Sequence, residues 1–227
     1  GFAQGRIPVI AGTGSNSTEE AIALTKHALK AGAQASLQVS PYYNRPTQKG
    51  LYLHFKAIAE SVDIPIILYN IASRTGVNIE PETFAKLSQI KNIIGVKEAS
   101  GSLEQMSRIR KLVPKDFLLI SGDDALTLPV MSIGGVGVIS VVANIIPRDV
   151  ANMCALFEKN DIRKAEELHY KMFDLIKAMF VETNPIPVKT AMGLMKMIDP
   201  GMRLPLCEML PENKEKLVKA LKDYRLI

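Results

Sequence analysis

Short apolar runs alternate with helical patterns along most of this sequence, and this alternation constrains the fold more than any other feature. The runs are four to six residues long and apolar almost throughout; they cover residues 7–11, 36–39, 64–69, 93–97, 117–121 and 136–140. Runs of this length and composition are typical of parallel strands that are buried on both faces of a sheet. Their alternation with helices therefore predicts an α/β protein with six parallel strands.

Helix signals separate the apolar runs. Residues 17–20 and 102–105 read as capping boxes, and the first of them predicts a helix that ends at Gly32. Pro81 stands where a first helical turn accepts proline, and Asp123 with Asp124 can cap a short helix over residues 126–133. The remaining helices are expected over residues 47–60, 147–159, 162–180, 186–197 and 211–224, with no strand after Phe180.

Two architectures fit six βα units followed by a helical tail from about residue 160. A doubly wound open sheet accommodates six strands. A (β/α)8 barrel needs eight strands in about 250 residues, so it fits if about 60 residues, or two units, are missing from the N-terminus. The pattern alone does not choose between the two.

Composition narrows the classes of protein. Apolar residues make up 47% of the chain, and 28 Lys and Arg against 23 Asp and Glu give a net charge of +5, which excludes disorder. The basic residues are dispersed and Trp is absent, so nucleic-acid binding has little support. Cys154 and Cys207 lie far apart and no apolar run has the length of a membrane span. We therefore expect a protein of a reducing compartment, the cytoplasm.

Chemistry-bearing side chains stand where the predicted strands end, which is where parallel α/β folds bind ligands. Lys97 and Tyr69 each close an apolar run, and Arg74 follows five residues after Tyr69. Burial lowers the pKa of a lysine, which makes its amine nucleophilic toward carbonyl groups. A tyrosine can transfer protons and an arginine can bind a carboxylate. Each residue alone is more often a solvated or structural side chain, but together they predict a site for a keto acid.

Other patterns carry less chemistry. The glycines at residues 12–14 and 134–137 fit neither a dinucleotide fingerprint nor a phosphate loop. Glu166 and His169 have the spacing used in di-metal helical bundles, but only once, so a solvated helix face is the expected interpretation. We expect no metal ion.

Five longer motifs surround these residues: SPYYNRP at 40–46, LYNIASRTG at 68–76, GVKEASG at 95–101, SGDD at 121–124 and GVIS at 137–140. Together they resemble the dihydrodipicolinate synthase family, within the pyruvate-dependent class I aldolase superfamily. The resemblance runs from about Arg6 to the C-terminus. It implies a (β/α)8 TIM barrel with a C-terminal helical domain, assembled as a homotetramer from tight dimers. We accordingly expect a barrel domain over residues 1–160, lacking roughly the first two βα units, and a helical domain over residues 161–227.

The resemblance also implies an activity and the roles of single residues. The activity is that of a lyase, which condenses pyruvate with L-aspartate 4-semialdehyde to 4-hydroxy-tetrahydrodipicolinate for lysine and diaminopimelate biosynthesis. Lys97 is implied as the Schiff-base residue, with no cofactor, and Tyr69 as the residue that moves protons. Tyr43 is implied as a relay residue that reaches the neighbouring subunit's site, and Arg74 as the ligand of the semialdehyde carboxylate. Substrate-binding roles near the pyruvate pocket are implied for Ile139, Gly122 and Asp123.

Two departures from the family pattern keep alternatives open. Ala72 stands where the family usually has proline, and the family's Gly-Thr-Thr-Gly-Glu stretch is absent. The alternatives are another pyruvate-dependent aldolase, such as an N-acetylneuraminate lyase, or a non-catalytic remnant that binds a small carboxylate. Arg74 favours the synthase, because the sialic acid lyases generally lack this arginine. Lysine feedback is a further implication, and it would use an allosteric site that contains Asn16, Glu20 and Tyr42.

Overall fold

The computed structural model describes residues 3–227, so Gly1 and Phe2, the first two residues of the predicted barrel domain, lie outside the described part. Contacts between residues divide the chain into two compact units. Unit 1 contains the residues up to Asp123 together with residues 129–138. Unit 2 contains residues 124–128 and residues 139–227.

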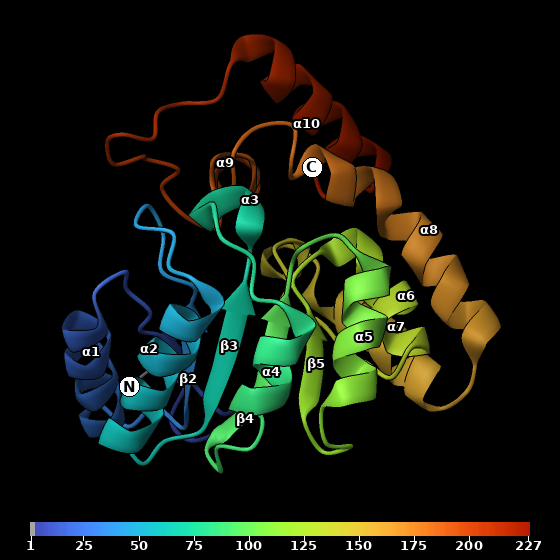
Figure 1. The fold of residues 1–227 in the computed structure, drawn as a ribbon. Coiled ribbons are helices and arrows are strands. Elements are labelled where there is room, and N and C mark those ends of the chain that lie inside the picture. The colour runs from blue at the N-terminus through green and yellow to red at the C-terminus, as the bar shows by residue number, and fades with distance from the viewer. Residues whose placement is uncertain (1–2) are drawn as a thin grey trace. The chain divides into compact units, whose positions relative to one another are not determined.

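Unit 1 is built on a parallel sheet of five strands (Figure 1). The strands are β1 (Ile10–Gly12), β2 (Ala35–Val39), β3 (Ile66–Asn70), β4 (Ile93–Glu98) and β5 (Leu118–Ser121). Each strand pairs with the next one in the chain, in the order β1-β2-β3-β4-β5. A doubly wound sheet reverses its strand order at a switch point, whereas a (β/α) barrel adds strands in sequence. The sequential order therefore resolves the choice that the sequence pattern left open, in favour of the barrel.

The sixth apolar run is not a complete strand in the described residues. Val138 pairs with Ser121 through a single parallel bridge, while the Ser121 N–H donates to the Gly137 carbonyl at 2.8 Å. Gly137 has a φ of +142°, which interrupts the extended backbone that a longer strand needs. The run thus continues the parallel order of the sheet but contributes one bridge where a whole strand was expected.

The helices of unit 1 begin largely where capping chemistry predicts. They are α1 (Thr18–Lys30), α2 (Gln48–Ser61), α3 (Ala72–Thr75), α4 (Pro81–Leu87) and α5 (Leu103–Leu112). The side chains of Ser17, Thr47 and Ser102 accept hydrogen bonds from the third residue that follows each of them. The Glu20 carboxylate accepts from the Ser15 hydroxyl. The predicted reciprocal bond, which the Ser17 N–H would donate to the Glu20 carboxylate, is thus replaced by one that the Ser15 hydroxyl donates.

Helix α6 (Thr127–Ser132) follows a short 3₁₀ turn over residues 124–126 and lies partly in each unit. Unit 2 otherwise contains a second 3₁₀ turn, Val142–Asn144, and helices α7 (Pro147–Glu158), α8 (Ile162–Ala178), α9 (Ile186–Leu194) and α10 (Pro211–Asp223). Its core includes Met172, Leu175, Leu217 and Leu221, which are at most 1% exposed.

One carboxylate joins three helical segments of unit 2. Asp149 of α7 lies 2.7 Å from the Lys171 Nζ of α8 and accepts a hydrogen bond from the hydroxyl of Tyr224, which follows α10. Contacts thus group α7 with α8 and α10, and the predicted domain boundary at residue 160 stays a prediction. Within residues 3–227, no helix has the length and apolar character needed to cross a membrane.

Candidate active site

Lys97 and Tyr69 are neighbours across two adjacent strands. The register of β3 and β4 pairs Tyr69 with Lys97, so both side chains emerge on the same face of the sheet. The Lys97 Nζ lies 4.2 Å from the centre of the Tyr69 ring, and both side chains are half-buried. Their predicted proximity is confirmed, which places an amine and a phenol together at the carboxyl end of β3 and β4.

Gly122 provides the space in which the Lys97 side chain lies. A Cβ at Gly122 would approach the Lys97 Cε to 3.2 Å and the Ala99 Cβ to 2.6 Å, so only glycine fits without a shift. The Gly122 N–H donates to the Glu98 carbonyl at 2.8 Å, which holds the turn after β5 against β4. Asp123 follows, and its backbone N–H lies 3.2 Å from the Ser121 hydroxyl. The structure therefore brings Gly122 to the predicted lysine.

The charge around Tyr69 has two opposing sources. Burial raises the pKa of the Tyr69 phenol, and the positive charge of Arg74 lowers it in part. Arg74 lies in α3, a one-turn helix that begins two residues after β3 and was not predicted. This helix ends at Thr75 and is capped by Gly76, whose φ is +76°. The Arg45 Nε donates to the Gly76 carbonyl at 2.9 Å. The electrostatic coupling between Arg74 and Tyr69 supports the predicted grouping of these two residues.

Tyr43 lies on the loop between β2 and α2, and its position differs from that of Tyr69. Its side chain is 91% exposed within the chain. Its φ is +73°, an uncommon conformation for a bulky residue, so the loop directs this side chain outward. Within one chain, Tyr43 is thus presented to solvent, and its predicted relay role stays a prediction.

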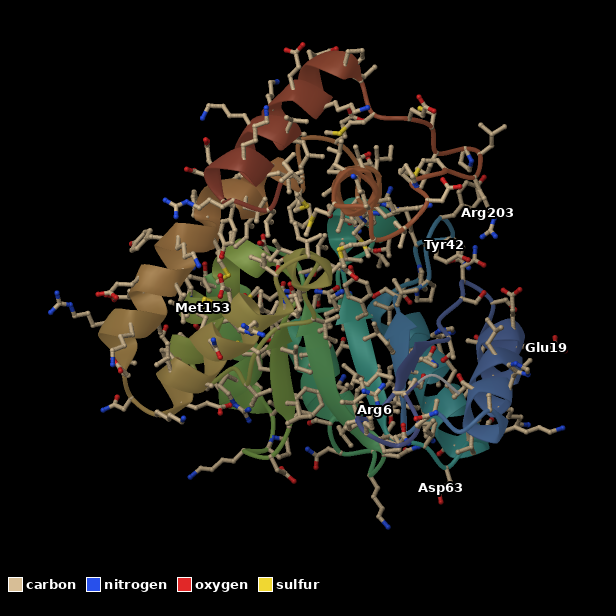
Figure 2. The ribbon with its side chains drawn as sticks, turned by 180° about the vertical axis from the view of Figure 1, so that it is seen from behind. Arg6, Glu19, Tyr42, Asp63, Met153 and Arg203 are labelled. Atoms are coloured by element: carbon tan, nitrogen blue, oxygen red, sulfur yellow. The ribbon has the colours of Figure 1, made fainter. Side chains whose placement is uncertain are left out.

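Two of the three residues that were predicted to bind lysine as a feedback ligand lie next to each other. The Asn16 Nδ2 donates to the Tyr42 carbonyl at 3.2 Å, and the Asn44 Nδ2 donates to the Asn16 carbonyl at 2.9 Å. Glu20 lies in the first turn of α1, one helical turn after Asn16. Figure 2 shows Tyr42 at one end of the strands and Asp63, which precedes β3, at the other. Asn16 and Tyr42 are therefore joined at the carboxyl end of the sheet.

Ile139 belongs to unit 2 and is described with that unit. The next residue, Ser140, donates its hydroxyl to the Asp124 carboxylate, which also accepts from the Val141 N–H at 2.9 Å. Asp124 is 3% exposed, so it anchors the turn that follows Ile139 from inside unit 2. The predicted contact of Ile139 with pyruvate stays a prediction.

Sequence reasoning missed the role of Glu98. In the sequence, Glu98 appears only as one residue of the GVKEASG motif. Because side chains alternate along a strand, Glu98 faces away from Lys97. Glu98 is 0% exposed and accepts from Asn70 Nδ2 at 2.9 Å and from the Ser100 N–H at 2.7 Å. The period-two alternation of β4 was the available signal, because it separates adjacent residues onto opposite faces.

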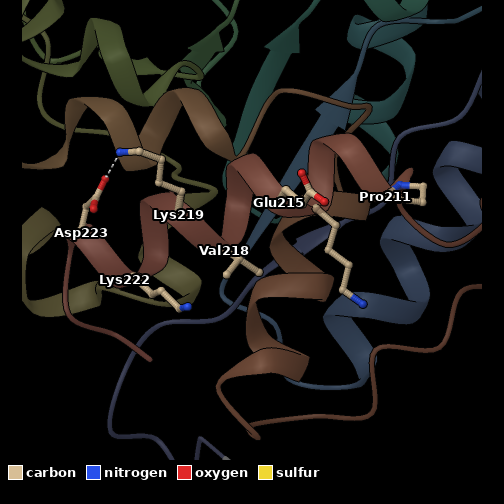
Figure 3. Close-up of a pocket in the computed structure, with 7 residues that line it drawn as sticks. Pro211, Glu215, Val218, Lys219, Lys222 and Asp223 are labelled. Carbon is tan, nitrogen blue, oxygen red and sulfur yellow. Dashed lines mark hydrogen bonds and ion pairs between the residues drawn. The ribbon is translucent and has the colours of Figure 1, made fainter.

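One surface pocket is lined by residues of unit 2 alone. It has a volume of about 630 Å³ and runs along α10, between charged side chains such as Lys214, Glu215 and Lys222 (Figure 3). Lys219 and Asp223 on the same helix form an ion pair at 2.6 Å. All of its lining residues come from one exposed helix, so it lacks the convergent groups of a reaction centre. Among residues 3–227, no cluster of three or more His, Cys, Asp or Glu side chains is arranged to hold a metal ion.

Known proteins with similar sequences share one description. The sequence model of the dihydrodipicolinate synthetase family matches residues 1–224. A 4-hydroxy-tetrahydrodipicolinate synthase of Endomicrobium trichonymphae is 62% identical over 226 residues, which is 99% of this chain and 77% of the relative. The enzyme of the same name from Persephonella marina is 58% identical over 228 residues, which is 100% of this chain and 78% of the relative.

Solved structures agree with the sequence relatives. Dihydrodipicolinate synthase from Aquifex aeolicus superposes with a TM-score of 0.97 at 52% identity, over 99% of this chain and 77% of that one. The Acinetobacter baumannii enzyme, in complex with pyruvate, gives 0.97 at 46% identity, over 99% and 77% of the two chains. The Cyanidioschyzon merolae enzyme, with lysine bound, gives 0.93 at 46% identity, over 97% and 75%. The sequential parallel sheet, the Lys97–Tyr69 pair and these matches lead to one conclusion: the chain belongs to the dihydrodipicolinate synthetase family.

Proposed function

We propose that this protein is a lyase that condenses pyruvate with L-aspartate 4-semialdehyde to 4-hydroxy-tetrahydrodipicolinate, in the biosynthesis of lysine and diaminopimelate. The observation that carries the proposal is the Lys97 Nζ at 4.2 Å from the Tyr69 ring, at the carboxyl end of adjacent parallel strands. Family membership supplies the substrates, because relatives that are 58% and 62% identical have this activity as their name.

The chemistry begins at Lys97. Its amine adds to the ketone carbon of pyruvate, and loss of water leaves a C=N bond to the lysine. The resulting iminium withdraws electrons and allows a proton to leave the methyl group, whose carbon then adds to the aldehyde carbon of the semialdehyde. The amino group of the semialdehyde adds to the iminium carbon and displaces Lys97, which closes the ring. The lysine supplies the electron sink, so the proposal needs no cofactor.

Tyr69 and Arg74 divide the remaining tasks. Burial raises the pKa of the Tyr69 phenol, and the nearby charge of Arg74 opposes this shift and favours the phenolate that forms when the proton moves to substrate. A guanidinium also binds a carboxylate through two hydrogen bonds. We assign Tyr69 to proton transfer and Arg74 to the carboxylate of the semialdehyde, with Gly122, Asp123 and Ile139 as neighbours of bound pyruvate.

We also propose an assembly in which Tyr43 completes the site of a neighbouring subunit, within a homotetramer of tight dimers. The 91% exposure of Tyr43 and its positive φ support this, because a strained and exposed aromatic side chain gains from burial in a partner. Lysine is proposed as a feedback ligand of Asn16, Glu20 and Tyr42, since the Cyanidioschyzon merolae relative holds lysine. The cytoplasm is the proposed compartment, in keeping with two free cysteines.

Borohydride trapping tests the proposal at its first covalent step. Incubation with pyruvate followed by reduction is expected to add one pyruvate-derived group per chain, and peptide mapping is expected to find it on Lys97. The Lys97→Arg variant is the matched control, because it keeps the positive charge but forms no stable imine. Adduct on the wild type at any other lysine, or none on the wild type, would contradict the proposal.

Turnover with the second substrate then separates the activity from those of related aldolases. Related pyruvate-dependent aldolases form the same adduct on lysine, so trapping alone does not distinguish them. The condensation of pyruvate with L-aspartate 4-semialdehyde is therefore compared with the cleavage of N-acetylneuraminate. We expect turnover of pyruvate with the semialdehyde and no cleavage of the sugar acid. We also expect Arg74→Ala to raise the KM for the semialdehyde far more than the KM for pyruvate. Preferred cleavage of the sugar acid would overturn the assignment.

A further inference from the structure

A second pair of side chains lies directly behind the Lys97–Tyr69 pair. Asn70 follows Tyr69, Glu98 follows Lys97, and the register of β3 and β4 pairs Asn70 with Glu98. Because side chains alternate along a strand, this second pair lies on the opposite face of the sheet. The Asn70 Nδ2 donates to the Glu98 Oε2 at 2.9 Å, and both residues are 0% exposed.

The polar character of this pair is unusual for its position. Two residues earlier on the same face, the register pairs Leu68 with Val96, and both are apolar and 0% exposed. A buried pair of this kind adds little net stability compared with apolar residues of similar volume, because desolvation opposes its hydrogen bonds. Stability alone therefore gives no reason for a carboxylate at the end of β4.

The bonds of Glu98 reach the segment after β4. Its Oε1 accepts from the Ser100 N–H at 2.7 Å, and its Oε2 also accepts from the Gln105 Nε2 of α5 at 3.4 Å. All of these donors are neutral. The carboxylate thus ties the strand that carries Lys97 to the loop that leads into α5.

The bonds of Asn70 reach the segment that carries Arg74. The Asn70 Oδ1 accepts from the Ile79 N–H at 3.0 Å, and its Nδ2 donates to the Asn78 Oδ1 at 2.8 Å. The segment from Ile71 to Ile79 contains α3 and Arg74. It starts directly after Asn70 in the chain, and at its end the Ile79 N–H bonds back to the Asn70 side chain. Asn70 therefore closes the Arg74-bearing segment against the strand that carries Tyr69.

We propose that Glu98 and Asn70 are positioning residues, which hold Lys97, Tyr69 and the Arg74 segment in the geometry that the reaction requires. This inference rests on the proposed function. Their mutual bond fixes the strand register at the residues that follow the reacting pair, and their remaining bonds fix the two segments that follow those strands. A displacement of about 1 Å in such an arrangement lowers turnover by on the order of 100-fold.

The Glu98→Gln variant tests the proposal with minimal change in shape. Both carboxylate oxygens face donors, so the new amide nitrogen meets a donor in either orientation. If the nitrogen faces Asn70, the Asn70 amide must turn and lose the Ile79 bond; if it faces Ser100, the Ser100 N–H loses its acceptor. We expect kcat to fall by about tenfold to 100-fold, with a much smaller change in the KM for pyruvate. The matched control is Thr25→Val, which removes hydrogen bonds from another polar cluster of unit 1 that is also 0% exposed.

A double variant distinguishes positioning from simple destabilisation. In Asn70→Asp/Glu98→Gln, the donor and acceptor of the bond between residues 70 and 98 exchange places, and the Ile79 N–H keeps its acceptor. The side-chain amides of Asn78 and Gln105, which bond residues 70 and 98 and each other, turn over together to keep their bonds. We expect the double variant to recover kcat relative to Glu98→Gln alone, which gives a positive coupling in the double-mutant cycle. The thermal midpoint of every variant is measured beside kcat, so that loss of folded protein is separated from loss of turnover.

Failure of the positioning role can be distinguished from failure of the proposed activity. If Glu98→Gln lowers the thermal midpoint as Thr25→Val does but keeps the wild-type kcat, the pair is structural and the proposal is overturned. The proposal also fails if Glu98→Gln does not fold and the double variant folds without regaining kcat. If instead the wild type forms no pyruvate adduct, the proposed function itself has failed and the positioning role falls with it.

Discussion

At the scale of single residues, the end of the Lys97 side chain lies close to the backbone of Gly122, where an added Cβ would come within 3.2 Å of the Lys97 Cε. The amine is therefore confined on one side by a glycine and on another by the Tyr69 ring. A flexible four-carbon side chain loses rotamer freedom in such a position. This conformational entropy is lost during folding and not when the substrate binds. The nucleophile is consequently held in place before any substrate arrives.

Gly122→Ala is expected to slow formation of the borohydride-trapped adduct by at least about tenfold, because its Cβ displaces the Lys97 Cε. The same Cβ also meets Ala99, which lowers the free energy of unfolding by about 1–3 kcal/mol. Adding Ala99→Gly relieves that second contact and is expected to restore stability while adduct formation stays slow. Gly12→Ala is the control, since nothing lies within 4 Å of its added Cβ. Wild-type trapping rates in Gly122→Ala would contradict the confinement of Lys97.

At the scale of helices and strands, the packing of α1 on α2 includes a buried histidine. His54 of α2 is 6% exposed, and its Nδ1 lies 2.8 Å from the Thr18 hydroxyl in the first turn of α1. Its Nε2 is buried, and no hydrogen-bond partner for this atom occurs among the residues that the structure describes. Burial lowers the pKa of His54 to about 4, since the charged ring would lose its hydration without gaining an anion.

This histidine is expected to make stability depend on pH in the acidic range. The pKa of about 4 in the folded chain lies below the ordinary value of 6.5, so the unfolded chain takes up the proton first. Its contribution is therefore complete above pH 6.5 and is lost as pH falls toward 4, by on the order of 3 kcal/mol. Urea unfolding at several pH values checks this.

His54→Gln is expected to flatten that pH dependence, whereas His27→Gln, at an exposed position of α1, is expected to leave it unchanged. Burial also lowers the pKa of His169, but that residue is present in both variants and contributes equally to each. Equal acid sensitivity of the wild type and His54→Gln would show that the buried ring does not control this transition.

The elements that sequence reasoning predicted correctly are those with local causes. Ser17, Thr47 and Ser102 cap helices because their side chains bond backbone groups only three residues away. The one-turn helix α3 was not predicted, because its start after β3 carries no capping side chain. The sixth strand was predicted as a whole strand but forms a single bridge, since the φ of Gly137 depends on how residues 136–138 meet β5. The Asn70–Glu98 bond could not be inferred without the strand register, which is a long-range property.

At the scale of the whole molecule, strand pairing positions the proposed site residues in unit 1, whereas side-chain bonds link the helices in unit 2. Unit 1 carries Tyr69 on β3, Lys97 on β4 and Arg74 on α3, the short helix that follows β3. The pairing of β3 with β4 fixes the proximity of Tyr69 and Lys97. In unit 2, Asp149 joins α7, α8 and the residue after α10 through an ion pair and a hydrogen bond. The proposed assembly adds a third level, because the exposed Tyr43 of unit 1 is assigned to the site of another chain.

Mixing two inactive variants tests that assignment. Lys97→Ala removes the nucleophile and Tyr43→Ala removes the proposed relay residue, so each homogeneous protein is expected to be nearly inactive. Subunits mixed under dissociating conditions and reassembled are expected to regain activity, because a hybrid dimer contains one site with an intact Lys97 and the partner's intact Tyr43. Lys97→Ala mixed with Tyr69→Phe is the control, since both residues act within one chain. Recovery in the control, or none in the first mixture, would contradict a role in trans.

The sequential order of the strands has a consequence for how the chain folds during synthesis. From β2 to β5, each strand pairs with its immediate predecessor, so each pairing can form as soon as the next βα unit has left the ribosome. The bond between Asn70 and Glu98 spans only 28 residues, whereas the bond between Tyr224 and Asp149 spans 75. Contacts that are close in the chain form early because little loop entropy opposes them. The Lys97–Tyr69 pair therefore belongs to the part of the protein that assembles first, before the last helix has been translated.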